Sequence, residues 1–190
     1  MSAHRCYLIL FNIAKPVNFG HLIRTANALG SEPVVIGRKS WNACGAAGGT
    51  RRTPVHHFYT LDEGIGFVRE AGCRVTGIEI LPEARSVVDE PFSGPTAFLP
   101  GNEGTGLTPQ HIALCDDFVY IPQFGTAVSL NINAATAVVL HRFATWAGRA
   151  ECARHEAKFR SSHTVRSAHA ALRSEPETGL SATADCDPDH

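Results

Sequence analysis

The residues of this sequence whose types and spacing suit chemistry gather in three separate stretches. The longest, residues 121–131 (IPQFGTAVSLN), joins a strand signal at 118–121 to a helix signal that begins at Asn131. A loop of Pro, Gly and small polar residues leaves backbone N–H and C=O groups without partners beside a helix N-terminus. Such a surface suits a ligand with a hydrogen-bonding base and a ribose, and an enzyme is the leading interpretation.

The second stretch, residues 101–107 (GNEGTGL), follows a predicted strand at 96–99 and places Glu103 among three glycines. Glycine is chosen where the chain turns left-handed or lets a ligand approach its backbone. The stretch is not a P-loop, because no G-K-[ST] follows. It is not the dinucleotide fingerprint either, because that motif lies between the first strand and helix. The plain alternative is a tight turn with an exposed Glu103.

The third stretch, residues 12–24, contains Asn18, Gly20 and Arg24. We expect Asn18 to cap a helix that starts near Gly20. Gly20 and Arg24 are one turn apart, so a bare backbone and a guanidinium share a face that a phosphate or ribose can approach. The plain alternative is an ordinary capped helix with a solvated arginine.

Hydrolysis and metal chemistry are disfavoured. Ser129 lacks a surrounding Gly-x-Ser-x-Gly, and the simplest role of Ser129 and Asn131 is helix capping. The pair at 56–57 (HH) lies in a predicted strand, where successive side chains point to opposite faces and cannot share one metal. The six cysteines are scattered without a C-x-x-C pair, so we expect no metal site.

Strand and helix signals alternate along the chain and predict an α/β domain with a mostly parallel sheet. We expect the last helix to present an apolar stripe to the core and to continue to about His169. Predicted strands lie at 7–11, 34–36, 55–59, 74–80, 96–99 and 118–121, and predicted helices at 20–29, 61–71, 108–115 and from 131 onward.

Size and charge indicate one domain with an extension. The 190 residues carry a net charge of −1, but six Lys or Arg against two Glu lie at 149–173, and five acids with no Lys or Arg lie at 174–190. We expect a domain at 1–148, a basic helical extension at 149–173 and an acidic disordered tail at 174–190. No apolar run reaches ~18 residues and no targeting segment is evident, which predicts a cytoplasmic protein without membrane contact.

The order and spacing of the three stretches resemble the SpoU family of RNA 2′-O-ribose methyltransferases, in the knotted SPOUT class. The family's Asn-x-Gly with a following Arg appears as Asn18, Gly20 and Arg24. Its Gly-x-Glu-x-x-Gly-Leu appears intact at 101–107, and its Ile-Pro-Met…Gly…Ser-Leu-Asn appears at 121–131 with Gln123 in place of Met. The resemblance covers residues 7–148.

The resemblance implies a parallel sheet flanked by helices, with a C-terminal deep trefoil knot. It implies S-adenosylmethionine bound in that knot, with Gly101, Ile121, Ser129 and Leu130 at the matching positions. It also implies a homodimer with the active site at the subunit interface, and a tRNA or rRNA substrate.

The catalytic residues that the resemblance implies are Asn18, Arg24, Glu103, Ser129 and Asn131. A guanidinium is a poor base at neutral pH, so we interpret Arg24 as a clamp that holds an RNA phosphate and stabilises the developing alkoxide. Asn18 and Asn131 would position Arg24 or the ribose, and Glu103 would orient Arg24 or accept a proton through water.

Outside the catalytic set, Arg24, Arg51, Arg52 and the basic extension are candidates for RNA contact. One competing hypothesis is an RNA-binding or ribosome-assembly factor that kept this fold without turnover. Another is a Rossmann-type nucleotide enzyme, which the missing early G-x-G-x-x-G disfavours.

Overall fold

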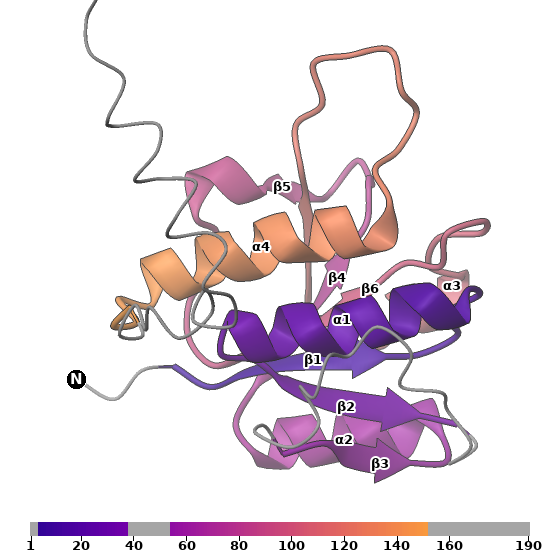
Figure 1. Ribbon diagram of the computed structural model, residues 1–190, viewed down its shortest axis with the longest axis vertical. Coiled ribbons are helices and arrows are strands. Elements are labelled where there is room, and N and C mark those ends of the chain that lie inside the picture. The colour runs from indigo at the N-terminus through magenta and orange to yellow at the C-terminus, as the bar shows by residue number, and fades with distance from the viewer. Residues whose placement is uncertain (1–3, 38–53, 152–190) are drawn as a thin grey trace, which may run out of the picture. The chain divides into compact units, whose positions relative to one another are not determined.

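The computed structural model describes residues 4–37 and 54–151, and all but the last two of these belong to a unit that spans Met1–Arg149. These residues form a parallel sheet in the order β3-β2-β1-β6-β4-β7-β5, with helices on its two faces (Figure 1). The strands are β1 (Cys6–Leu10), β2 (Glu32–Ile36), β3 (His56–Phe58), β4 (Arg74–Ile78), β5 (Arg85–Ser86), β6 (Thr96–Pro100) and β7 (Asp117–Tyr120). The helices are α1 (Pro16–Ala28), α2 (Leu61–Glu70), α3 (Pro109–Ile112) and α4 (Ile132–Trp146), with a 3-10 turn η2 (Val87–Asp89).

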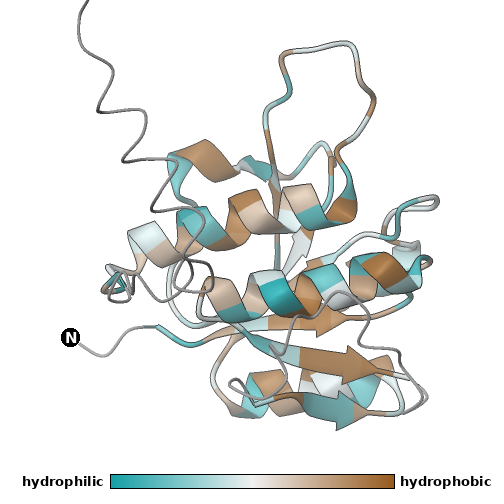
Figure 2. Ribbon diagram, viewed as in Figure 1, coloured by the Kyte–Doolittle hydropathy of each residue, from teal (hydrophilic) through white to brown (hydrophobic). Residues whose placement is uncertain are grey.

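Alternating side chains of the central strand β1 enter two different cores. Leu8 and Leu10 pack with residues of α1 and α4, whereas Tyr7 and Ile9 pack with residues of α2. Parallel strands covered on both faces are apolar along their length, and β1 and β2 are coloured as hydrophobic over most of theirs (Figure 2). This double burial explains why the strands appear in the sequence as short apolar runs.

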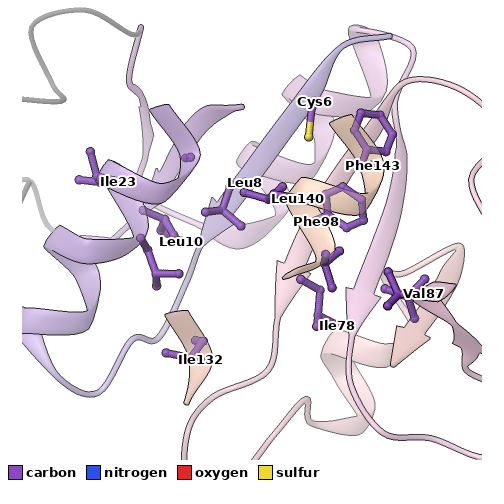
Figure 3. Close-up of a cluster of buried hydrophobic side chains, with 14 of the residues drawn as sticks. Cys6, Leu8, Leu10, Ile23, Ile78, Val87, Phe98, Ile132, Leu140 and Phe143 are labelled. Atoms are coloured by element: carbon purple, nitrogen blue, oxygen red, sulfur yellow. The ribbon is translucent and has the colours of Figure 1, made fainter. Parts of the chain in front are cut away.

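The core under α4 is built on aromatic rings. Phe98 of β6 and Phe143 of α4 are fully buried and meet edge to face, with ring centroids 5.5 Å apart (Figure 3). Phe92 packs edge to face against both rings. Such aromatic pairs contribute ~0.5–1.5 kcal/mol beyond their buried area. They fix α4 over the sheet and so fix where the chain before α4 must enter.

The predicted strands are present, and two predicted helix starts are confirmed. Thr108 caps α3 with Pro109 in its first turn, and Asn131 caps α4 by accepting a hydrogen bond from the Asn133 N–H. The short strand β5 and the turn η2 were not predicted, because a two-residue strand is too short to show a period.

Two expectations about helices are wrong. Helix α1 begins at Pro16 rather than near Gly20, and its cap residue is Lys15, so Asn18 lies inside the helix and caps nothing. The fixed φ of proline suits the first helical position. Helix α4 ends at Trp146 rather than continuing to about His169, and Gly148 follows in a left-handed conformation (φ 61°).

The end of this unit is tied to its beginning. The Arg149 guanidinium donates hydrogen bonds to the carbonyl oxygens of Leu29, Gly30 and His4, and lies over the Phe143 ring. Arg149 therefore packs with residues 4–148, although its charge suggested grouping it with the basic extension. The rest of the predicted extension, from residue 152, and the acidic tail lie outside the described residues.

Candidate active site

A cavity of about 260 Å³ lies where strands β4, β6 and β7 end. Three segments line it: the end of β4 and its continuation, the loop after β6, and the chain from the end of β7 into α4. Ligands of open parallel sheets bind beyond the carboxyl ends of the strands. The volume lies near the lower end of the range of small-molecule sites, ~300–1,000 Å³, and accommodates a nucleoside-sized group.

All four residues predicted to bind a cofactor line this cavity. Gly101 comes from the loop after β6, and Ile121, Ser129 and Leu130 come from the segment between β7 and α4. Residues 20 to 29 positions apart in the chain are therefore neighbours around one space. The fold brings together what the sequence could only propose as separate motifs.

The segment between β7 and α4 leaves its backbone available. Figure 1 shows it extending away from the sheet before it enters α4. Within the described part of the chain, no hydrogen bond engages the backbone of residues 123–130. Pro122, Gly125 and small polar residues explain why no regular structure forms here. The free N–H and C=O groups are the kind that read the edge of a base.

The loop after β6 is closed by its own backbone. Asn102 and Gly106 exchange two N–H···O bonds of 3.2 and 3.0 Å, and Gly106 adopts a left-handed φ of 64° that favours glycine. The Asn102 side chain donates to the Asn12 carbonyl oxygen at 2.7 Å. Glu103 therefore projects from a rigid turn rather than from a mobile loop.

Glu103 joins this turn to the beginning of α1. Its Oε1 accepts from the Asn18 side-chain amide at 2.7 Å, and its Oε2 accepts from the Ala14 N–H at 3.2 Å. Partial burial acts to raise the pKa of Glu103. The hydrogen bonds from Asn18 and from backbone N–H groups outweigh it, so the pKa lies below its ordinary value. Glu103 is thus an ionised carboxylate that holds buried Asn18 in place.

Arg24 lies apart from this cluster. It is exposed on α1, does not line the cavity, and its side chain enters none of the hydrogen bonds or ion pairs found in the described residues. The expectation that Glu103 or Asn18 orients Arg24 directly is not met, because those two side chains bond to each other. Within one chain, Arg24 and the cavity are separate.

Asn131 caps α4 and is not among the residues that line the cavity. Two residues later, Asn133 accepts a hydrogen bond from the Thr25 hydroxyl at 2.8 Å. This bond fixes the start of α4 against α1, next to Arg24. Ser129 lies two residues before the cap, exposed and lining the cavity.

Sequence reasoning gave Glu79 no role. It follows β4, lines the cavity, and its Oε2 accepts from the Leu107 N–H at 2.9 Å. A Cβ at Gly101 would collide with this carboxylate, and one at Gly106 would lie 2.5 Å from it. The only sequence signal was an acid at the end of the strand predicted at 74–80. Arg51 and Arg52 lie outside the described residues.

Among the described residues, the remaining polar groups form no metal centre and no second cluster of catalytic type. No group of His, Cys, Asp and Glu in the described ranges could hold a metal ion. His56 pairs with Glu32 at 2.7 Å, and His57 bonds to the Gly37 carbonyl oxygen, so the two rings serve different partners as predicted. No helix in the described ranges is long and apolar enough to cross a membrane.

Comparison with known proteins places these features in a family. The model of the SpoU rRNA methylase family matches residues 5–141. The tRNA (guanosine(18)-2′-O)-methyltransferase of Escherichia coli K12 is 29% identical over 133 residues, which are 68% of this chain and 58% of that protein. The protein of the same description from Thermus thermophilus is 30% identical over 141 residues, which are 70% of this chain and 71% of that protein.

A solved structure agrees in fold. The SpoU methyltransferase AviRb from Streptomyces viridochromogenes, in complex with the cofactor AdoMet, has a TM-score of 0.66 and 27% identity. The match covers 77% of this chain and 61% of AviRb. The chain spans less than two thirds of the E. coli protein and of AviRb. Because the family model covers most of the unit described above, this chain belongs to the SpoU rRNA methylase family.

Proposed function

We propose that this protein methylates a ribose 2′-hydroxyl in tRNA or rRNA and uses S-adenosylmethionine as the methyl donor. The observation that carries the proposal is the cavity at the ends of β4, β6 and β7, which Gly101, Ile121, Ser129 and Leu130 line together. The relatives named above are tRNA methyltransferases, and AviRb was solved with AdoMet.

The residues of the cavity fit this donor. Gly101 lines the cavity with backbone atoms alone, and the place of a Cβ is taken by the Glu79 carboxylate, which packs against it. Ile121 and Leu130 supply apolar walls, and the backbone of Gln123, Ser129 and Leu130, which line the cavity, supplies donors and acceptors. Ser129 offers a hydroxyl at the same wall. When bound, S-adenosylmethionine supplies a methyl group to the ribose oxygen, keeps the electron pair of the broken carbon–sulfur bond and becomes a neutral thioether.

The chain's own task is to align the ribose and to stabilise the oxygen as its proton leaves. Alignment alone supplies ~7–11 kcal/mol. We assign the electrostatic part to Arg24, whose exposed guanidinium has no protein partner among the described residues and matches a phosphate in two-point geometry. The clamp lowers the cost of negative charge on the 2′-oxygen, and the proton passes to solvent or to the phosphate.

Glu103, Asn18, Ser129 and Asn131 are assigned positioning roles. Glu103 and Asn18 fix the turn after β6 against the start of α1. The lowered pKa of Glu103 makes it a weak proton acceptor, which argues against its use as the base. Asn131 fixes the start of α4, and Ser129 faces the donor.

We propose that two copies form the active unit, with Arg24 of one copy completing the cavity of the other. Arg24 does not line the cavity of its own chain. Phe124 and Val128 are 97% and 93% exposed on the segment before α4, and Val17 on α1 and Val138 on α4 are also exposed. These exposed apolar side chains are available to be buried between two copies of the chain.

We also propose the trefoil knot. Strand β7 lies between β4 and β5 in the sheet, although only residues 79–84 connect β4 to β5. The chain that leaves β7 returns as α4 against β4, η2 and α1. This order suits a chain that passes through the loop made by residues 79–95. Single-molecule stretching of a knotted chain gives a shorter final length than its residue number allows, and full extension would contradict the knot.

RNA contact outside the cavity is assigned to Arg51, Arg52 and the basic extension. Truncation after Glu151 keeps Arg149 and its bonds while removing most of the extension. We expect the truncated protein to bind RNA more weakly, with a flatter salt dependence. We assign the protein to the cytoplasm, in keeping with Cys6, Cys73 and Cys115, which are free thiols.

The test of the proposed function begins with calorimetric titration of the purified protein with S-adenosylmethionine. Ribose methylation is then mapped in cellular RNA with and without the gene. We expect saturable binding and the loss of at least one 2′-O-methyl mark. Binding without any lost mark would favour the assembly-factor hypothesis, and a copurifying nicotinamide cofactor would favour the nucleotide enzyme.

A further inference from the structure

The charged side chains that line the cavity are all carboxylates. Glu79 and Glu103 contribute to the wall, and no Lys, Arg or His is among the described residues that line it. The other lining side chains are neutral, and several are apolar, such as Ile78, Ile121 and Leu130. A partly enclosed, apolar site strengthens the interaction between a wall charge and a ligand charge. The cavity therefore discriminates between ligands by their charge.

The Glu79 carboxylate is fixed at this wall. Its Oε1 accepts from the Ile80 N–H at 3.0 Å, and its Oε2 accepts from the Leu107 N–H at 2.9 Å. Its own N–H donates to the Val119 carbonyl oxygen at 3.1 Å, which continues the pairing of β4 with β7. The carboxylate also packs against Gly101 and Gly106, where no side chain intervenes. Glu79 cannot turn away from the cavity without breaking these contacts.

The two carboxylates of the wall are not equivalent. Glu103 lies against the start of α1, where the helix dipole and the Asn18 amide offset its charge. Glu79 accepts only from backbone N–H groups, and no Lys, Arg or His in the described ranges bonds to or pairs with it. Its negative charge is therefore the less compensated of the two.

We propose that Glu79 is a specificity-determining residue that favours the sulfonium donor over its thioether product. The inference rests on the proposed function. The donor carries a positive sulfonium and the product carries a neutral sulfur, and the two share the base, the ribose and the amino-acid group. A fixed negative charge in the wall attracts the donor more than the product, which limits inhibition by the product and aids its release.

A different role for Glu79 has a different signature. If its carboxylate served only to accept from ribose hydroxyls, or only to shape the turn after β6, its loss would weaken the donor and the product equally. The ratio of the two dissociation constants therefore separates a charge effect from a hydrogen-bonding or structural effect. It can be measured without catalysis and without RNA.

The experiment measures the dissociation constants of S-adenosylmethionine and S-adenosylhomocysteine by calorimetry for the full chain and for Glu79→Gln. Glutamine keeps an oxygen that can accept from the Leu107 N–H, which retains this bond to the turn, and it loses the bond from the Ile80 N–H, which would affect both ligands alike. We expect affinity for the donor to fall roughly ten-fold and affinity for the product to change less than about two-fold. Glu83→Gln is the matched control, because Glu83 is exposed four residues later and does not line the cavity.

A second variant separates the effect of the charge from the effect of a changed turn geometry. Glu79→Asp keeps the charge but shortens the reach to the Leu107 N–H. We expect it to weaken both ligands while keeping a preference for the donor that Glu79→Gln loses. A preserved ratio in Glu79→Gln overturns the inference but leaves the proposed function standing. A wild-type protein that binds neither ligand overturns both.

Discussion

Glu103 accepts hydrogen bonds from Asn18 and from the Ala14 N–H, and these bonds limit what its carboxylate can do in catalysis. A carboxylate stabilised in its charged form takes up a proton less readily than a free one. Asn18 is a buried residue of α1, so its hydrogen bond to Glu103 links two motifs that are 85 residues apart in the chain. In our proposal, proton removal from the ribose therefore uses another acceptor.

Because the pKa of Glu103 is lowered, the stability lost in a Glu103→Gln variant should depend on pH. A carboxyl with a folded pKa below its unfolded value stabilises the fold at pH above the unfolded value, about 4.3, and this stability is lost as pH falls through the folded pKa. Glu103→Gln should therefore be less stable than wild type at pH 7, by less than about 1 kcal/mol because Glu103 is partly exposed. Urea unfolding at pH 7 and near pH 3 tests this, and a constant difference would contradict it.

Arg24→Lys separates charge from shape at the proposed clamp. Lysine keeps the positive charge but loses the planar fork that grips a phosphate at two points. We expect kcat/KM for RNA methylation to fall by about 100-fold, with affinity for S-adenosylmethionine unchanged, because the proposed clamp grips an RNA phosphate rather than the donor. Arg142→Lys, exposed on α4, is the control. Normal methylation by Arg24→Lys would contradict the proposed role of Arg24 as a phosphate clamp.

At the scale of elements, the turn after β6 has two tasks. It lines the cavity, and it carries Glu103, which bonds to Asn18 of α1. Glu79 holds it from the side of the sheet, and Glu103 holds it against α1. Its glycines differ in what surrounds them. A Cβ at Gly101 would meet Glu79 and the backbone of Gly106, whereas a Cβ at Gly104 would find its nearest neighbour, Asn102 Oδ1, at 3.6 Å.

The two glycines therefore make a matched pair of variants. Gly101→Ala must displace the Glu79 carboxylate or the turn, and we expect affinity for S-adenosylmethionine to fall at least about ten-fold. Gly104 also lines the cavity, but Gly104→Ala needs no displacement of protein atoms, and we expect it to lose less affinity than Gly101→Ala. Calorimetry of both variants, with thermal unfolding to verify folding, tests the shape of the wall. Equal affinities would mean that the ligand does not use this part of the cavity.

The elements that the sequence predicted well depend on local signals. Thr108 followed by Pro109 combines a capping residue with a proline that suits the first helical position, and the buried runs of β1 and β6 are strands because both of their faces are covered. Asn18 was misassigned as a cap because its partner, Glu103, comes from a distant segment. Glu79 was missed for the same reason, since its contacts with Gly101 and Leu107 exist only after folding.

At the scale of the whole molecule, Arg24 does not line the cavity that the described residues of one chain form. Two of the three motifs meet at the cavity, while the motif with Arg24 is linked to it through Asn18 and Glu103. A second copy of the chain completes the arrangement in our proposal. No spacing in one sequence could report this, because the missing contact would lie between molecules.

Substitutions in the exposed segment before α4 should disrupt the proposed dimer. Phe124→Asp combined with Val128→Asp places two charges on the most exposed apolar side chains of this region. We expect the sedimentation coefficient to fall from that of a dimer to that of a monomer, with loss of methylation. Tyr59→Asp, at a 70% exposed position outside this segment, is the control. A wild-type protein that sediments as a monomer would contradict the dimer directly.

The central claim is that this chain transfers a methyl group from S-adenosylmethionine to a ribose oxygen of RNA. The most direct measurement incubates the purified protein with S-adenosylmethionine labelled in its methyl group and with tRNA and rRNA, followed by nucleoside analysis. The account predicts label in 2′-O-methylated nucleosides, and none with Arg24→Ala. Label on a base, or no label in either RNA from a protein that binds the donor, would contradict it.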